Sequence, residues 1–179
     1  MMKKNVSFAL IVIIAFSIAG CIYSGPETSS PETQSTPIQT HIIGQSVDDG
    51  NSRMTLNNVR YTQVIDEKKN ESHVARSETN KQFLIINVTI ENISPNKNMS
   101  YNGYQFIMLD SKGIIYEEDA SASKQLAKKF NGNDMVPGDK REGELSFQIP
   151  VDAKGLRLRF EYSQESTSGL RLEFFKLDR

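Results

Sequence analysis

Apolar and polar residues alternate along much of the segment 42–179, with the period of two that is typical of half-buried β-strands. The clearest case is the segment 83–90, where polar Asn87 and Thr89 point to one side of the predicted strand. The other side carries four aliphatic residues: Leu84, Ile86, Val88 and Ile90. We therefore predict a central strand here, with this aliphatic side in the core.

The same alternation predicts further strands on both sides of the central one. They cover residues 53–61, 104–109, 113–116, 142–149, 156–162 and 170–174. Asp110 and Gly113 suit a tight turn, so the second and third of these segments should form a hairpin. The last two segments alternate almost perfectly and follow each other closely, so we expect an antiparallel pair.

Weaker patterns complete the expected set of elements. A short strand is predicted around Ile42 and Ile43, and only residues 120–130 offer a helical turn or two. Pro150 should end the strand before it, because proline cannot donate a hydrogen bond to a sheet ladder. About seven or eight short strands with turns between them predict an all-β, immunoglobulin-like antiparallel β-sandwich with one short helical turn.

The first twenty residues have a different pattern from the rest of the chain. Lys3 and Lys4 precede an apolar core at residues 8–18, and no acidic residue occurs before Cys21. This apolar run is shorter than the roughly 20 residues that a membrane-spanning helix needs. The arrangement is that of an export signal.

Ile18, Ala19, Gly20 and Cys21 close this leader. They resemble the lipobox of prokaryotic lipoproteins, in which the cysteine receives a diacylglyceryl group and becomes the first residue of the mature chain. Two acyl chains give the stable membrane attachment that one chain does not. The resemblance implies a lipid anchor at Cys21 on the outer face of the cell membrane or at the cell surface. An ordinary secretory signal that happens to contain a cysteine is the alternative.

Composition divides the remaining chain into two parts. Residues 21–41 are rich in Ser, Thr and Pro, cannot bury a core and are expected to be a tether. At about 3.1 Å per residue, an extended tether would reach roughly 60 Å. We therefore expect a signal peptide at 1–20, a tether at 21–41 and a sandwich domain at 42–179.

The composition excludes several kinds of protein. Cys21 is the only cysteine, which excludes an intramolecular disulfide and paired-cysteine zinc sites. The leader contains two of the 21 basic residues, so the mature chain has 19 basic and 22 acidic residues and a net charge of −3. A slightly acidic chain is a poor binder of nucleic acid.

No catalytic, cofactor or metal motif stands out beyond Cys21. The two histidines are His41, in or near the tether, and His73, in a polar loop, so neither a Ser-His-Asp triad nor a multi-histidine metal site can be assembled. There is no glycine-rich phosphate loop either. We therefore expect no enzyme, no cofactor and no assigned metal ligand. The acidic clusters at 48–51 and 117–119 lack the ordered ligand spacing of a calcium loop, so we interpret them as a turn and a solvated strand end.

Three other residue types are candidates for recognition. Aromatic residues are enriched at interfaces, so an exposed patch is one interpretation of five tyrosines: Tyr61, Tyr101, Tyr104, Tyr116 and Tyr162. Met99, Met108 and Met135 are more simply core residues than ligands of a soft metal. Four Asn-X-Ser/Thr triplets begin at Asn70, Asn87, Asn92 and Asn98, and in an exported protein they are candidate glycosylation sites, none of which the sequence singles out.

A resemblance to a known family rests on several short segments in a fixed order. They read IGQ at 43–45, KQFLIINVTIEN at 81–92, FIMLDSKG at 106–113, VPGD at 136–139, FQIP at 147–150 and KGL at 154–156. In this order the segments resemble the telokin-like, immunoglobulin-like domain of unknown function of prokaryotic surface lipoproteins. The resemblance implies an extracytoplasmic sandwich and transfers no catalytic or binding residue.

Two functions from different classes remain open. One is a noncatalytic module for protein interaction or adhesion, whose partner is an envelope or extracellular protein. The other is a solute- or cation-binding lipoprotein that serves a transporter or sensor. A solute binder should have a pocket lined by convergent polar groups, whereas an interaction module should present a flat or convex patch.

Overall fold

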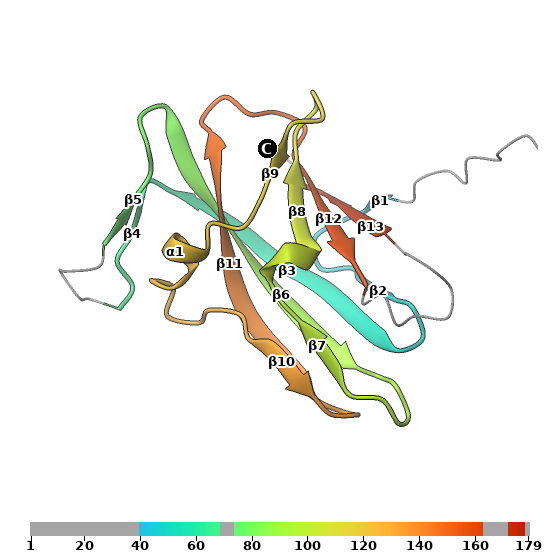
Figure 1. The fold of residues 1–179 in the computed structure, drawn as a ribbon. Coiled ribbons are helices and arrows are strands. Elements are labelled where there is room, and N and C mark those ends of the chain that lie inside the picture. The colour runs from blue at the N-terminus through green and yellow to red at the C-terminus, as the bar shows by residue number, and fades with distance from the viewer. Residues whose placement is uncertain (1–39, 69–73, 163–171, 178–179) are drawn as a thin grey trace, which may run out of the picture. The chain divides into compact units, whose positions relative to one another are not determined.

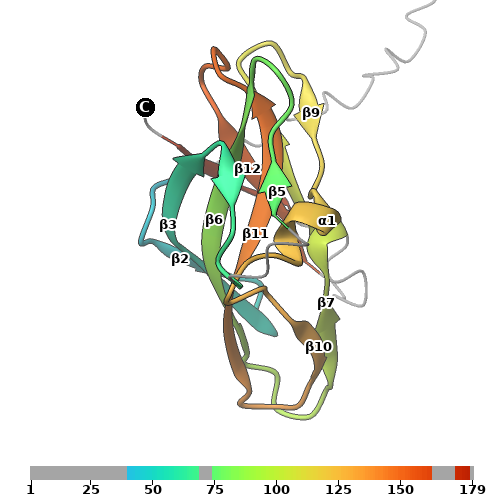
Figure 2. The same ribbon diagram turned by 90° about the vertical axis from the view of Figure 1, so that its left-hand side faces the viewer.

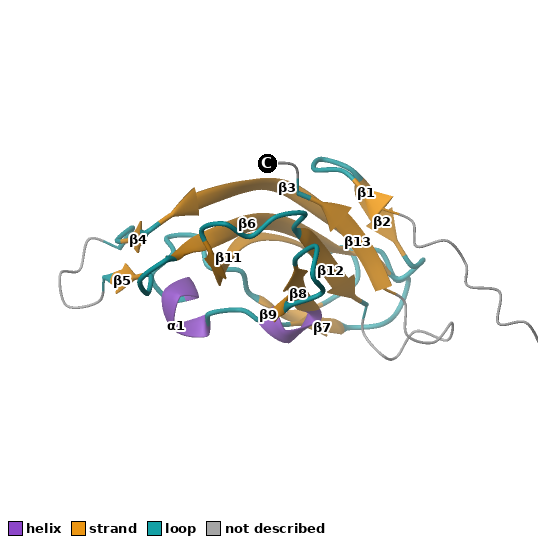
Figure 3. Cartoon of the chain, turned by 90° about the horizontal axis from the view of Figure 1, so that it is seen from above, coloured by secondary structure: helices purple, strands orange, loops and turns teal. Residues whose placement is uncertain are grey.

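The computed structural model describes residues 40–68, 74–162 and 172–177. Two larger sheets make up most of this part of the chain (Figure 1). The first has four antiparallel strands in the order β11 (Lys140–Pro150), β6 (Lys81–Asn92), β3 (Ser52–Thr62) and β2 (Ser46–Asp48). The second has five strands in the order β1 (Thr40–His41), β13 (Leu172–Lys176), β12 (Arg157–Glu161), β8 (Phe106–Leu109) and β9 (Ile115–Tyr116). Seen from above, the curved β3–β6 layer and the layer that contains β8 and β12 are separate, so the predicted all-β sandwich is confirmed (Figure 3).

Smaller elements flank the two sheets. They are the pair β4 (Val64–Ile65) and β5 (Ala75–Arg76), the ribbon of β7 (Met99–Tyr101) and β10 (Gly132–Met135), the helix α1 (Ala120–Ser123) and the 3₁₀ turn η2 (Gly103–Gln105). Figure 2 shows the β7–β10 ribbon extending below α1. No helix among the described residues is long and apolar enough to cross a membrane.

The main core lies between the two sheets. Leu84, Ile86, Val88 and Ile90 are fully buried in it, as the alternation in β6 predicts. Phe160 lies at the centre of an aromatic cluster, with ring centroids 5.9, 5.0 and 4.9 Å from those of Tyr101, Phe106 and Tyr162. Each such aromatic side chain contributes about 1.5–3 kcal/mol through burial alone.

The outer face of β6 is buried as well. Phe83 and Ile85 pack there in a second cluster with Ile65, Ala122 and Leu126. Along the same face, Asn57 in the β-bulge of β3 donates hydrogen bonds to Asn87 Oδ1 at 2.5 Å and to Thr89 Oγ1 at 2.9 Å. Asn87 and Thr89 are on the side that the sequence predicts, and their partners in neighbouring strands allow them to be buried.

Most predicted strands are confirmed. The hairpin forms, with Met108 opposite Tyr116, and β12 pairs with β13 in antiparallel fashion. Residues 104–105 belong to η2 rather than to the strand predicted there. The pairing of β1 with β13 is parallel, and it places Thr40 and His41, which the sequence assigns to the tether, in the sheet.

One short prediction is wrong: residues 42–45 form a turn between β1 and β2 because Gly44 has a φ of +87°, and Ile42 is 63% exposed. The short helical turn predicted within residues 120–130 is confirmed, since α1 spans four residues there. Further on, Phe130 N donates to Glu144 O at 2.9 Å, so the chain leaves the helix to cover the edge of β11.

Candidate functional site: a polar hollow beside the β8–β9 edge

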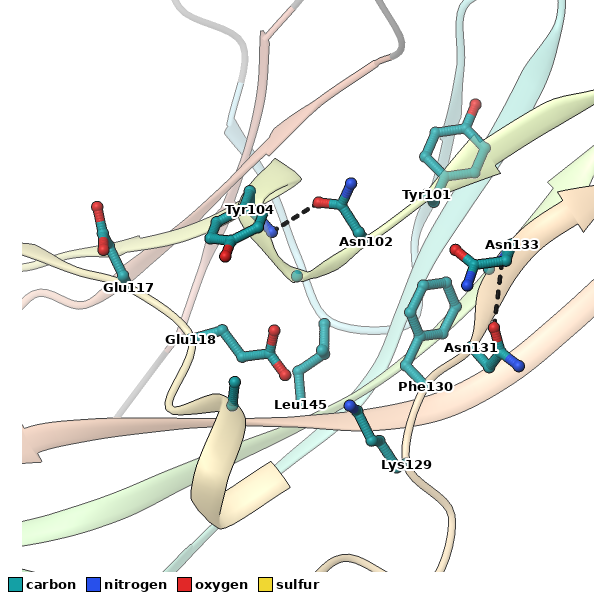
Figure 4. Close-up of a pocket in the computed structure, with 13 residues that line it drawn as sticks. Tyr101, Asn102, Tyr104, Glu117, Glu118, Lys129, Phe130, Asn131, Asn133 and Leu145 are labelled. Atoms are coloured by element: carbon teal, nitrogen blue, oxygen red, sulfur yellow. Dashed lines mark hydrogen bonds between the residues drawn. The ribbon is translucent and has the colours of Figure 1, made fainter. Parts of the chain in front are cut away.

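A hollow of about 690 Å³ lies beside the β8–β9 edge of the five-stranded sheet (Figure 4). Its walls come from three separate parts of the chain, residues 101–104, 117–120 and 129–133. Leu145 of β11 also lines it. Because η2 precedes β8 and the second segment follows β9, the register of this hairpin brings the first two walls together.

The first wall is held by the cap of η2. Asn102 Oδ1 accepts from Tyr104 N at 3.0 Å, and Gln105 Oε1 accepts from Asn102 N at 2.9 Å. This reciprocal capping box holds the turn rigidly. It leaves the Tyr104 ring 83% exposed at the rim of the hollow.

The second wall carries Glu118, whose backbone pairs with Phe147 of β11. In Figure 4 the Glu118 carboxylate points toward the centre of the hollow, and that of Glu117 points away from it. Glu118 Oε1 is buried and has no hydrogen-bond partner among the described residues. A buried oxygen without a partner costs about 1–3 kcal/mol, so Glu118 Oε1 is an unsatisfied acceptor in this wall of the hollow.

The third wall combines a cation with two amides. Lys129 pairs through its backbone with Glu144, and Gly143 lets the backbone of Phe130 come close to β11. Beyond it, Asn131 Oδ1 accepts from Asn133 N at 3.3 Å. The Lys129 ammonium and the side-chain NH₂ groups of the two asparagines are hydrogen-bond donors.

Tyr101 lines the hollow and is buried. Its hydroxyl hydrogen-bonds with the Ser52 hydroxyl. Burial raises the pKa of Tyr101 to about 12, against the opposing effect of the Ser52 hydrogen bond. This phenol therefore stays neutral at physiological pH and acts as part of the core.

The hollow combines charged, polar and aromatic groups. The lining residues supply carboxylates, amides, an ammonium and three aromatic rings. Glu117 and Glu118 point in different directions, so they do not form a facing pair of carboxylates of the kind that glycoside hydrolysis uses (Figure 4).

The first acidic cluster and Asp119 of the second have structural roles. Asp49 Oδ1 accepts from Asn51 N and Ser52 N at 2.9 and 2.8 Å, and Gly50 has a φ of +86°, so the first cluster is a turn. Asp119 caps α1 by accepting from Ala122 N at 2.9 Å. Among the described residues no group of three or more His, Cys, Asp or Glu side chains is placed to hold a metal ion.

The other candidate residues are mostly in the core. Of the five tyrosines, Tyr101 and Tyr162 are buried, Tyr61 and Tyr116 are half-buried and only Tyr104 is exposed, so they form no patch. Two methionines, Met108 and Met135, are fully buried, and Met99 packs against the core. His41 is buried against the Phe175 ring, with centroids 5.5 Å apart. Cys21, Asn70 and His73 lie outside the described residues.

Tyr104, Glu117 and Glu118 were each predicted from the sequence as separate candidates for recognition or metal binding, whereas Lys129, Asn131 and Asn133 of the third wall were not. The only sequence signal for the third wall is the polar run at 131–134 between two buried positions, Phe130 and Met135. Such a run is indistinguishable from an ordinary loop until its partner segments are known.

Several solved structures resemble this fold, and three of them are compared with it in turn. The yjhA protein from Bacillus subtilis is 26% identical, with a TM-score of 0.58 over 78% of this chain and 100% of its own. MPT63, a secreted protein from Mycobacterium tuberculosis, is 11% identical, with a TM-score of 0.55 over 78% of this chain and 98% of its own. An uncharacterized β-sandwich protein from Clostridium difficile is 15% identical, with a TM-score of 0.52 over 82% of this chain and 100% of its own. At these identities the last two support the fold alone.

Comparison by sequence gives the family. No protein of curated function matches this chain. The model of DUF4352, a domain of unknown function, matches residues 41–170, which is most of the chain and nearly all of the sandwich. This chain therefore belongs to the DUF4352 family of domains of unknown function.

Proposed function

We propose that this protein is an exported lipoprotein, anchored through Cys21, whose telokin-like, immunoglobulin-like sandwich is a noncatalytic module for protein interaction or adhesion. In this role the leader directs export, and the diacylglyceryl group on Cys21 holds the protein at the membrane surface. The tether at 21–41 lets the domain extend away from that surface. The domain then presents the polar hollow to an envelope or extracellular protein.

The unpartnered Glu118 oxygen is the observation that carries this proposal. A folded domain gains nothing from an acceptor that is buried at the base of a hollow and left without a donor. A donor from a partner would satisfy it, and the exposed Tyr104 ring beside it offers the aromatic contact that is enriched at interfaces.

The position of the hollow in the sheet also supports an interaction role. The strand order is β1-β13-β12-β8-β9, so β1, which follows the tether, and the hollow lie at opposite edges of one sheet. A partner at the hollow therefore lies at the edge of this sheet that is farthest from β1.

The experiment that tests this proposal is site-specific photo-cross-linking in native membranes. In the full-length protein, Tyr104 is replaced by p-benzoylphenylalanine, and Ile42, exposed at the opposite edge, is replaced in a matched control. We expect a discrete adduct from position 104, none from position 42, and several-fold less adduct when Glu118→Gln is added. Equal adducts from both positions, or no effect of Glu118→Gln, would contradict a role for the hollow.

A solute-binding lipoprotein is the second candidate, because the volume of the hollow is within the range of small-molecule sites, roughly 300–1,000 Å³. Against it, exposed side chains line most of the hollow, whereas such sites cover most of their ligand. A thermal-shift screen with Ca²⁺ and small polar solutes separates the two candidates. A rise of several degrees with one compound, without an adduct from position 104, would favour the solute binder.

A further inference from the structure

The Asn-X-Ser/Thr triplets of the mature chain differ in ways that only the structure reveals. For an Asn-linked glycan, the side-chain amide nitrogen must not be held in hydrogen bonds within the fold. The asparagine must also be exposed enough for the sugar to extend into solvent. Three of the four triplets, beginning at Asn87, Asn92 and Asn98, lie within the described residues.

Asn87 does not meet these requirements. Its side chain is 7% exposed in the middle of β6. Its Oδ1 accepts from Asn57 Nδ2, and its own Nδ2 donates to Glu142 Oε1 at 3.1 Å. A sugar on this nitrogen would have to displace the neighbouring strands. A glycan at Asn87 is therefore incompatible with the fold.

Asn92 is held even more tightly. It is fully buried, and its Nδ2 donates to Lys97 O at 2.8 Å and to Met135 O at 2.9 Å. Its Oδ1 accepts from Ser94 N at 3.0 Å. This amide links the end of β6 to β10, which is a structural role that leaves no hydrogen for substitution.

Asn98 differs from both. It lies immediately before β7 and is exposed, and no described residue makes a hydrogen bond with its side chain. Ser100, the third residue of the triplet, is also exposed. We propose that Asn98 is the N-glycosylation site of the described domain, an inference that rests on the proposed export of the chain.

The reaction is a substitution at the anomeric carbon of a polyprenyl phosphate-linked saccharide. Asn98 Nδ2 forms the new C–N bond to C1 of the sugar and loses one proton. The C1–O bond to the lipid phosphate breaks, and its electron pair leaves with the phosphate. No oxidant or reductant takes part.

Peptide mapping of the full-length protein, purified from the membranes of the organism that encodes it, tests the site. Trypsin cleaves after Lys81, Lys97 and Lys112, so Asn87 and Asn92 share the peptide 82–97, whereas Asn98 begins the peptide 98–112. We expect a saccharide mass on the second peptide only, localised to Asn98 by electron-transfer fragmentation, which also localises it when cleavage after Lys97 is incomplete. An unmodified Asn98, or a saccharide on Asn87 or Asn92, would overturn the proposal.

Two variants of the same exposed side chain sharpen the test. Ser100→Ala removes the triplet and should abolish the mass shift, whereas Ser100→Thr keeps the triplet and should retain it. If both variants keep the modification, the triplet does not direct it and the proposal fails. The membrane fraction and the mass of the Cys21 peptide are measured in the same sample, so a failure of export is seen separately from an unmodified Asn98.

Discussion

The carboxylate of Glu118 packs against the Cα of Gly103, in the space that the Cβ of any other residue would occupy. This contact joins the segment after β9 to η2 and orients the unpartnered carboxylate toward the hollow. A glycine in η2 is thus required for the placement of a polar group that lies fifteen positions further along the chain.

Gly103→Ala should move the Glu118 carboxylate. The new methyl group would overlap Glu118 Oε2 at the end of a flexible side chain that can rotate aside, so we expect a loss of about 1 kcal/mol or less in the free energy of unfolding, measured by urea denaturation. In a Glu118→Ala background the same change should cost much less, because the overlapping atoms are gone. Equal costs in both backgrounds would show that the contact does not constrain Gly103.

Glu118→Gln should weaken binding without weakening the fold. Replacing this half-buried carboxylate, one oxygen of which is buried without a partner, should leave the free energy of unfolding unchanged or raise it by up to about 1 kcal/mol. Photo-cross-linking from position 104 should fall several-fold in the same variant. Glu117→Gln is the matched control, because Glu117 is exposed and points away from the hollow, and it should change neither quantity.

Gly143→Ala should be strongly destabilising. A Cβ at this position of β11 would overlap the backbone of Phe130, which cannot rotate away, so we expect a loss of about 2–3 kcal/mol. Gly44→Ala provides the comparison: its φ of +87° is unfavourable but no atom is nearby, and it should cost only about 1 kcal/mol. Chemical denaturation measures both, and a neutral Gly143→Ala would contradict the close approach.

Asp110 should make stability depend on acidic pH. Burial opposes its ionisation, but hydrogen bonds from Ile114 N at 2.9 Å, Tyr116 Oη at 3.0 Å and Lys112 N at 2.8 Å together lower the pKa of Asp110 below its ordinary value. A lowered folded-state pKa contributes stability that is present above the unfolded-state pKa, near 4, and is lost as the pH falls through the folded-state value.

Asp110→Asn should therefore have a lower denaturation midpoint than the parent at about pH 7 and a smaller further loss of stability below about pH 4. Urea titrations at several pH values measure the difference. Tyr116→Phe removes one of the three hydrogen bonds and should give an intermediate profile. Parallel pH profiles for the parent and Asp110→Asn would refute the role of this carboxylate.

Cys21→Ser should remove the lipid anchor and leave the sandwich intact. The variant should leave the detergent phase of a Triton X-114 partition, because serine does not supply the thiolate that accepts the diacylglyceryl group. Its melting temperature should match that of the parent, since residue 21 lies outside the family domain at 41–170. Ser24→Ala is the control, and a Cys21→Ser protein that still enters detergent would argue against lipidation.

The strands that the sequence predicted correctly are long and have one clear periodicity. In β6, β11 and β12 the apolar positions alternate over at least five residues, and each alternate set is buried. The pairs β4–β5 and β7–β10 were not predicted because strands of two to four residues are too short to show a period.

The candidate site was predicted only in part, since its walls come from three segments that are separated by twelve and by eight residues. Tyr104, Glu118 and Asn131 meet because the β8–β9 hairpin closes and because the chain after α1 covers the edge of β11. Neither of these two tertiary contacts can be predicted from the local hydrophobic pattern or from composition.

The sequence by itself determined the all-β class and the face of each long strand that enters the core, because burial follows a period of two and needs no knowledge of the neighbouring strand. Only the tertiary structure decided which polar groups find partners. Asn87 and Asn98 begin similar triplets, yet one is enclosed by β3 and β11 and the other is exposed. Asp110 accepts its three hydrogen bonds from residues 112, 114 and 116 of its own hairpin. The surroundings of Glu118 come instead from segments far away in sequence, and none of the described residues supplies a donor to its Oε1.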